Sequence, residues 1–147
     1  MQENTIEIIL VEDNPPDVEM TLSALKERNL GNKVLVLRDG AEALDYIMKN
    51  VDCRPGQADE HRPKVILLDL KLPKIDGLEV LRRIRSDGRT ESVPVVILTS
   101  SDEERDRIAS YELGANSYVV KPVGFEDFAR AVAELGCYWV LMNKPPY

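Results

Sequence analysis

The chain has 147 residues, enough for one domain whose core folds without disulfide bonds or a structural metal. Its 26 acidic and 19 basic residues give a net charge of −7, which argues against nucleic acid as a partner. Cys53 and Cys137 have neither the spacing of a zinc site nor the density of a disulfide framework. With no apolar run long enough for a membrane span and no signal-peptide pattern at 1–6, we expect a soluble, cytoplasmic protein.

Short apolar segments alternate with helical patterns along the chain. The predicted strands are 6–11, 34–37, 65–68, 95–98 and 118–120. They are rich in β-branched residues and apolar almost throughout, which is typical of strands covered on both faces. Apolar residues at helical spacing follow each strand, and Asn14-Pro15 and Asp76-Gly77 are typical helix starts. The polar segment 50–63 is predicted to be a surface loop.

Five strand-then-helix units predict an α/β fold with a parallel sheet between two layers of helices. Parallel strands need crossover connections, and right-handed crossovers cover both faces of the sheet. Reactive side chains in such a fold lie at the carboxyl ends of the strands. The residues that follow each predicted strand are therefore the candidates for function.

Acidic residues follow two of the predicted strands, Glu12-Asp13 after the first and Asp69 after the third. The fourth strand is followed by Thr99 and the fifth by Lys121. Three carboxylates in one crevice repel one another and need a counter-charge, which a divalent cation and an ammonium group supply. Oxygen ligands in this number suit Mg²⁺, which usually completes its shell with water and phosphate oxygens.

A carboxylate can also act as a nucleophile toward phosphorus and form an aspartyl phosphate. Asp69 stands alone after a central strand, whereas Glu12 and Asp13 form a pair suited to holding the metal. Taken singly, each residue also has a plain structural role, as a helix cap, a turn residue or an exposed lysine. Complementary groups at four strand ends together favour the phosphoryl-transfer interpretation.

The motifs in this order resemble the receiver domain of two-component response regulators. They are Val11-Glu12-Asp13-Asn14, Leu67-Leu68-Asp69-Leu70 with Pro73 and Asp76-Gly77, Leu98-Thr99-Ser100, Gly114-Ala115, and Tyr118-Val119-Val120-Lys121-Pro122. The opening at 12–17, the loop at 50–63 and Tyr138-Trp139 are most similar to single-domain regulators associated with bacterial phytochromes. The resemblance implies a flavodoxin-like (βα)5 fold with strand order 2-1-3-4-5. It also implies one receiver domain over 1–147, with a core at about 5–140 and a tail at 141–147.

The resemblance implies a role for each site residue. The implied roles are phosphoacceptor for Asp69, metal ligands for Glu12 and Asp13, switch hydroxyl for Thr99, phosphoryl contact for Lys121, aromatic switch for Tyr118 and a main-chain metal ligand for Lys71. The cofactor would be Mg²⁺ or Mn²⁺ and the phosphodonor a sensor histidine kinase, which the closer resemblance implies to be of the phytochrome type. Lys71 departs from the small or amide residues common at its position, which puts the lifetime of the phosphorylated state in doubt. By the same analogy the Lys121-Pro122 bond is expected to be cis.

The segment after Lys121 is expected to form one helix and a short tail, so we expect output by protein contact. Apolar residues continue from Tyr138 to Met142, and they either fold back on the domain or form a contact surface. We expect a homodimer through the fourth helix, fifth strand and fifth helix. A basic cluster at Arg82, Arg83, Arg85 and Arg89 is interpreted as a solvated helix face.

Two other functions are open on the sequence. A phosphatase with an aspartate nucleophile commonly carries a second acid two residues after the nucleophile, where this chain has Lys71. An atypical receiver, which binds partners without phosphorylation, usually lacks one of the acids, the threonine or the lysine, and this chain keeps them all. We therefore expect a phosphoacceptor signalling domain with no enzymatic function beyond phosphotransfer to itself and slow dephosphorylation.

Overall fold

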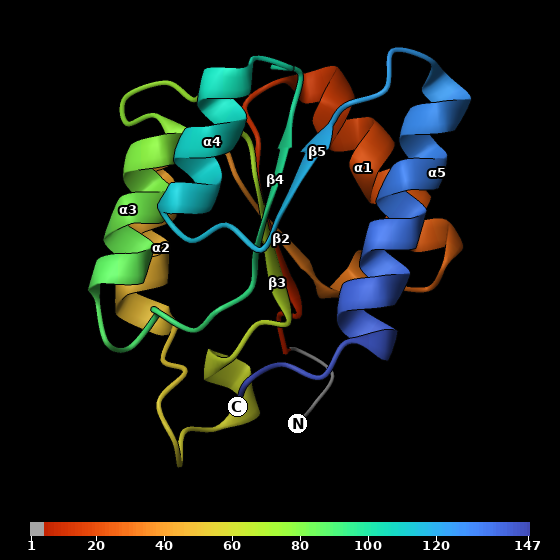
Figure 1. Cartoon of the computed structure of the whole chain (residues 1–147). Helices are drawn as coiled ribbons and strands as arrows, with labels where there is room; N and C mark the ends of the chain where they lie inside the picture. The colour runs from red at the N-terminus through yellow and green to blue at the C-terminus, as the bar shows by residue number, and fades with distance from the viewer. Residues whose placement is uncertain (1–4) are drawn as a thin grey trace.

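The computed structural model describes residues 5–147, which form a parallel five-stranded sheet between two layers of helices (Figure 1). The strands are β1 (Ile8–Val11), β2 (Val34–Leu37), β3 (Val65–Leu68), β4 (Val95–Thr99) and β5 (Ser117–Val120). Their order in the sheet is β2-β1-β3-β4-β5, which confirms the predicted order. All four pairings are parallel, so the carboxyl ends of all five strands lie at one edge.

Helices cover both faces of the sheet, as predicted. They are α1 (Pro15–Glu27), α2 (Gly40–Asn50), α3 (Gly77–Ser86), α4 (Glu104–Glu112) and α5 (Phe125–Gly136), with short 3-10 helices η2 (Gly31–Lys33) and η3 (Asp59–His61). Helices α1 and α5 pack on one face, and α2, α3 and α4 lie on the other (Figure 1). Asn14 and Asp76 cap α1 and α3 by accepting a backbone N–H with their side chains, as their sequence context predicts.

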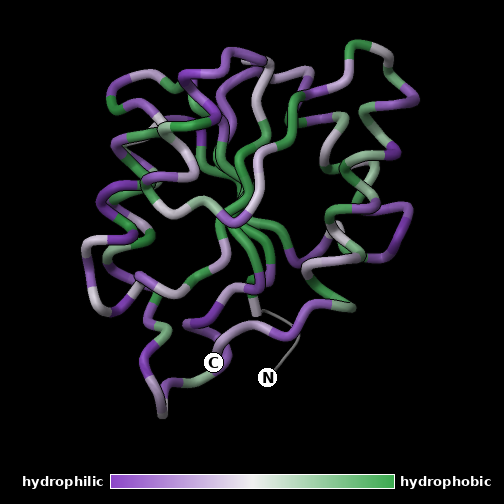
Figure 2. The backbone as a smooth tube through the Cα atoms, in the orientation of Figure 1, coloured by the Kyte–Doolittle hydropathy of each residue, from purple (hydrophilic) through white to green (hydrophobic). Residues whose placement is uncertain are grey.

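The strands contribute alternate residues to two apolar layers. Ile9, Ile66 and Ile97 pack with α2 and α3, whereas Ile8 and Leu67 pack with α1 and α5. All of these side chains are at most 1% exposed, and the hydrophobic colouring of Figure 2 is concentrated along the central strands. A sheet buried on both faces explains why its strands lack the polar–apolar alternation of a solvated sheet.

Some of the C-terminal apolar residues fold back on the domain and others form an exposed surface, which are the two alternatives that the sequence left open. Helix α5 continues as a π-helical segment, η4 (Cys137–Met142). Within it Trp139 and Val140 are each only 9% exposed and belong to the core, whereas Leu141 and Met142 are exposed. The segment therefore both folds back on the domain and leaves an apolar surface.

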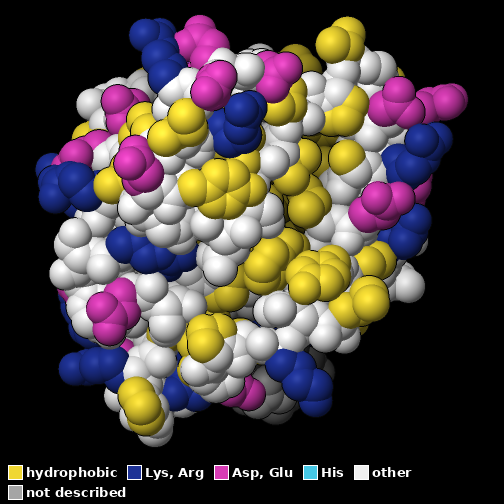
Figure 3. All heavy atoms as spheres, viewed as in Figure 1, with side chains coloured by type: hydrophobic (Ala, Val, Ile, Leu, Met, Phe, Trp, Pro, Cys, Tyr) yellow, Lys and Arg dark blue, Asp and Glu magenta, His cyan; other side chains and the backbone are white. Residues whose placement is uncertain are grey.

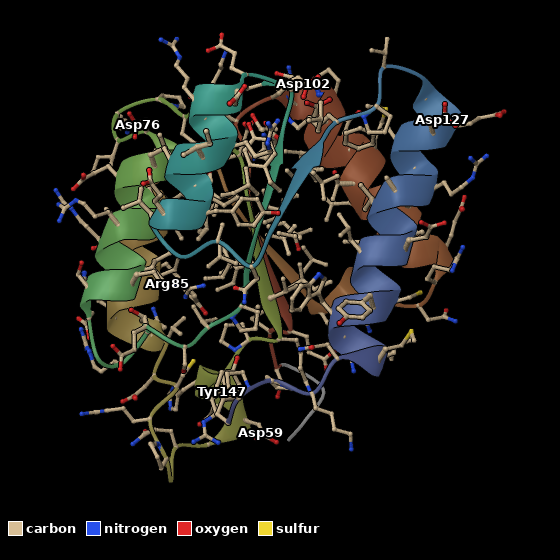
Figure 4. The ribbon with its side chains drawn as sticks, in the orientation of Figure 1. Asp59, Asp76, Arg85, Asp102, Asp127 and Tyr147 are labelled. Atoms are coloured by element: carbon tan, nitrogen blue, oxygen red, sulfur yellow. The ribbon has the colours of Figure 1, made fainter. Side chains whose placement is uncertain are left out.

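The tail after η4 returns to the amino-terminal end of the sheet. The Tyr147 hydroxyl donates a hydrogen bond to the carbonyl oxygen of Pro63, and the Arg62 guanidinium lies 5.4 Å from the centre of the tyrosine ring. In Figure 4, Tyr147 lies near Asp59 of η3, at the opposite end of the domain from Asp76 and Asp102. The loop predicted at 50–63 is thus partly helical and is covered by the tail.

The peptide bond before Pro122 differs from the prediction. The Lys121–Pro122 bond is trans, so the expected cis bond is wrong. The chain reaches its bend after β5 without that isomer.

Over residues 5–147 no helix combines the length and the apolar character that crossing a membrane requires.

Candidate functional site

The candidate site lies at the carboxyl edge of the sheet, where the three central strands and β5 end. Glu12 directly follows β1, Asp69 follows β3, Thr99 is the last residue of β4 and Lys121 follows β5. The backbone N–H of Lys121 donates to the carbonyl oxygen of Thr99 at 2.7 Å, which fixes the start of the lysine side chain beside β4. The sheet therefore positions these residues as the sequence predicts.

Lys121 is the centre of the charged cluster. Its Nζ lies 2.5 Å from Oε1 of Glu12, 3.0 Å from Oδ2 of Asp69 and 2.8 Å from Oδ2 of Asp17. The side chains of Lys121, Glu12 and Asp69 are only 7%, 3% and 8% exposed. Ion pairs this short and this shielded from water restrict the lysine far more than surface pairs would.

Three carboxylates of the cluster could hold a metal ion. Glu12, Asp13 and Asp69 each offer an oxygen within 4.8 Å of the others; Asp13 is exposed, and the other two are buried. A donor set of carboxylate oxygens, open to solvent on one side, fits Mg²⁺ or Mn²⁺ better than a soft metal. The exposed position of Asp13 leaves room for water and phosphate oxygens in the coordination shell.

The protonation of the cluster follows from its burial. Burial raises the pKa of Glu12 to about 7, although the hydrogen bond from Lys121 opposes this change. Burial would lower the pKa of Lys121, but its hydrogen bonds to Asp17 and Glu12 outweigh that effect and raise the pKa above its usual range. The lysine is therefore charged, and a cation that binds Glu12 near neutral pH must displace a proton from part of the population.

Thr99 and Tyr118 lie on neighbouring strands and are linked through Ser101. Thr99 is completely buried, and its Oγ1 accepts a hydrogen bond of 3.3 Å from the backbone N–H of Ser101. The half-buried Tyr118 donates its hydroxyl hydrogen to the carbonyl oxygen of Ser101 at 2.9 Å. The loop that leads from β4 to α4 is therefore held at both sides by the two predicted switch residues.

Lys71 lies beside Asp69 with its side chain in solvent. Its backbone N–H donates to Oδ1 of Asp69 at 3.3 Å, so the two oxygens of Asp69 have different partners. Gly77, the first residue of α3, packs directly behind this segment, and a Cβ added there would lie 2.2 Å from the carbonyl oxygen of Asp69. The absence of a side chain at Gly77 therefore allows Asp69 its position.

Asp17 is a member of the cluster that the sequence did not predict. It lies in the first turn of α1. In the sequence it is part of the opening at 12–17 that resembles phytochrome-associated regulators, and no site role was predicted for it. A signal was present, because only three residues separate β1 from α1, and so short a connection places the first turn of the helix at the same sheet edge. The site thus holds a fourth carboxylate.

Comparisons with known proteins agree with this geometry. Residues 8–133 match the family described as the response regulator receiver domain. The response regulator Rcp1 of Synechocystis sp. is 37% identical over 133 residues, which are 90% of this chain and 88% of that protein. The crystal structure of the Mn²⁺-bound form of Rcp1 is 36% identical, covers 95% of this chain and 98% of its own, and gives a TM-score of 0.82.

Two other solved structures come from phytochrome systems. The phosphorylated cyanobacterial phytochrome response regulator RcpA is 35% identical, with 97% of this chain and 99% of its own covered and a TM-score of 0.84. The bacteriophytochrome response regulator RtBRR is 54% identical, with 97% and 84% covered and a TM-score of 0.69. These matches confirm the predicted flavodoxin-like fold and the resemblance to phytochrome-associated regulators. The chain belongs to the family of response regulator receiver domains.

Proposed function

We propose that this receiver domain accepts a phosphoryl group on Asp69 from a sensor histidine kinase, with Mg²⁺ or Mn²⁺ held by Glu12, Asp13 and Asp69. The observation that carries the proposal is the position of the Lys121 ammonium, 3.0 Å from Asp69 and within the carboxylate cluster. A cation fixed beside the nucleophile can neutralise the charge of an incoming phosphoryl group. The main-chain carbonyl of Lys71 is proposed as a further metal ligand.

The proposed reaction is a transfer between two side chains. A carboxylate oxygen of Asp69 attacks phosphorus, a P–O bond forms, and the P–N bond to the kinase histidine breaks while the imidazole keeps the electron pair and takes up a proton. When bound, the divalent cation would neutralise charge on the phosphoryl oxygens. Lys121 would exchange its contact with Asp69 for one with a phosphoryl oxygen.

Thr99 and Tyr118 are proposed to carry the signal away from the site. A phosphoryl group on Asp69 would draw the hydroxyl of Thr99 from the Ser101 N–H toward a phosphoryl oxygen. Because Tyr118 is bonded to the carbonyl of the same Ser101, that movement would release its ring and favour an inward position. The phosphoryl group would thus shift an equilibrium between two arrangements of the β4–α4 loop.

A phytochrome-type kinase is proposed as the phosphodonor. Support comes from the similarity to RtBRR and RcpA, whose descriptions place them in phytochrome systems. A cytoplasmic location belongs to the same proposal, since Cys53 and Cys137 are both free thiols, as a reducing compartment maintains them. Phosphotransfer profiling against the kinases of the host would test the pairing, and reaction with unrelated kinases alone would contradict it.

The output is proposed to be a protein contact, in part between two copies of this chain. Exposed apolar side chains gather on α4, β5 and η4, where Figure 3 shows hydrophobic groups side by side. They include Ile108, Tyr111, Val120, Tyr138, Leu141 and Met142. Large apolar side chains grouped on one face are typical of protein interfaces. Sedimentation with and without a beryllium fluoride mimic tests this dimer, and a monomer in both conditions would refute it.

Intact-mass measurement tests the proposed phosphorylation. The wild type, incubated with Mg²⁺ and a small acyl phosphate, should gain the mass of one phosphoryl group, whereas Asp69→Asn should gain none. Addition of EDTA should abolish the gain. An unmodified wild type would favour a module that binds partners without phosphorylation, and steady hydrolysis of phosphate esters would favour a phosphatase.

A further inference from the structure

Lys121 has three carboxylate partners, and one of them lies outside the proposed metal site. Glu12 and Asp69 belong to the group with oxygens within 4.8 Å of one another, which in residues 5–147 is completed by Asp13 and does not include Asp17. Asp17 nevertheless lies 2.8 Å from the Lys121 ammonium. An ammonium has three N–H donors, so the three carboxylates use all of them.

Asp17 is held in place independently of the other acids. Its backbone N–H donates to Oδ1 of Asn14 at 3.0 Å, which fixes it in the first turn of α1. Its side chain is 23% exposed, compared with 3% for Glu12 and 8% for Asp69. Asp17 is therefore the most exposed of the three partners and comes from α1, whereas Glu12 and Asp69 are buried where β1 and β3 end.

A divalent cation and Lys121 compete for the same carboxylates. Lys121 contacts Oε1 of Glu12 and Oδ2 of Asp69, and these are two of the three carboxylates that a cation at this site would bind. The lysine side chain is only 7% exposed, so water replaces the lost contacts poorly. A third carboxylate outside the metal group gives the ammonium a partner that the cation does not take.

We infer that Asp17 is a positioning residue that retains the Lys121 ammonium at the sheet edge while Glu12 and Asp69 bind the metal and the phosphoryl group. The inference rests on the proposed function and adds a residue to it. Without the charge of Asp17, Lys121 has only the two buried carboxylates as partners and competes for them more strongly. The affinity for Mg²⁺ should then fall by roughly a factor of ten, the usual scale of one hydrogen bond between charged groups.

Calorimetric titration of the full chain with Mg²⁺ alone tests the inference. Asp17→Asn should raise the Mg²⁺ Kd about tenfold. Glu19→Gln is the matched control, since Glu19 is an exposed residue of the same helix and its replacement removes the same charge. The control should change the Kd by less than about twofold, as expected for a screened surface charge. An unchanged Kd for Asp17→Asn would overturn the inference.

A double-mutant cycle separates action through Lys121 from a general effect of charge. In a Lys121→Met background, Asp17→Asn should change the Mg²⁺ Kd no more than Glu19→Gln does, because the ammonium that Asp17 retains is gone. An equal change in both backgrounds would show a direct effect of the Asp17 charge and refute the positioning role. Circular dichroism of each variant confirms that the comparison is made between folded proteins.

A failure of the proposed phosphorylation can be distinguished from a failure of the positioning role of Asp17. If the wild type gains no phosphoryl mass while Asp17→Asn still weakens Mg²⁺ binding through Lys121, phosphorylation is wrong and the positioning role stands. If Asp17→Asn and Glu19→Gln are both phosphorylated, the Asp17→Asn protein should need about ten times more Mg²⁺ than Glu19→Gln to reach half its maximal rate of phosphorylation. Its rate at saturating Mg²⁺ should equal that of Glu19→Gln, which a general loss of folded protein would not produce.

Discussion

Replacing Lys121 with methionine tests how strongly the charged cluster is coupled to folding. The substitution keeps most of the apolar stem but leaves the buried Glu12 and Asp69, and the partly exposed Asp17, without their shared cation. Removing one partner from a buried ion pair usually costs about 3–5 kcal/mol. For a domain of this size that loss lowers Tm by roughly 6–20 °C.

The loss should depend on pH and on metal, which separates electrostatics from packing. Urea unfolding, followed by the fluorescence of the single and buried Trp139, should give the full loss at pH 8 in EDTA. The loss should shrink at pH 5, where Glu12, whose pKa burial raises to about 7, takes up a proton, and in excess Mg²⁺, which supplies the missing charge. Lys49→Met, which removes an exposed ion pair with Asp45, should cost less than about 0.5 kcal/mol. A loss that is the same in all three conditions would refute the electrostatic explanation.

Three other predictions concern single positions. The pKa of Glu12 is raised in the folded state to about 7 from 4.5, so folding favours the protonated form. The metal-free wild type should therefore lose stability as pH rises from about 4.5 to 7, and Glu12→Gln should not, which urea unfolding across this range tests. Gly77→Ala should cost about 1–3 kcal/mol and weaken Mg²⁺ binding by displacing Asp69, whereas Gly88→Ala, in open space, should change neither. Tyr147→Ala should cost about 1–3 kcal/mol in thermal unfolding through its lost hydrogen bond and cation–π contact, and an unchanged Tm would contradict that docking.

The fold could be predicted because its signals are local and repeated. The apolar segments 65–68 and 95–98 predict strands that are buried on both faces, and in the structure every residue of β3 and β4 is buried. The caps at Asn14 and Asp76 marked helix starts through side-chain chemistry that needs no knowledge of the tertiary structure. Strand order, in contrast, was expected from the family resemblance, since no single strand encodes its neighbours.

The site was predictable only where the sheet itself places a side chain. Glu12, Asp69 and Lys121 follow strands directly, so their meeting at one edge follows from parallel pairing. Asp17 was missed because its contact depends on the direction in which α1 leaves that edge. Whether a side chain on the first turn of a helix points toward a strand end depends on packing that the sequence pattern does not specify.

Arg85 shows a second limit, because the interpretation of the basic cluster as a solvated face does not hold for it. Its guanidinium donates to the carbonyl oxygens of Gly114, Glu91 and Val93 and to Oδ1 of Asn116. Burial lowers its pKa, since no carboxylate is among these four partners. Carbonyl groups leave no charge pattern in a sequence, so a cation that binds them is indistinguishable from a surface arginine before the fold is known.

The proposed signalling face includes the helix that is least firmly packed. Ser110 is the one buried residue of α4, whereas α3, of similar length, buries four. Segments with few buried apolar contacts shift at the lowest free-energy cost. The amino-terminal end of α4 adjoins the loop held by Thr99 and Tyr118, and the turn after its carboxyl-terminal end is bound at Gly114 by Arg85. A change at Asp69 that frees this loop would therefore move one end of α4 about a fixed end, and would rearrange the exposed Ile108 and Tyr111 on the surface where we propose the second copy to bind.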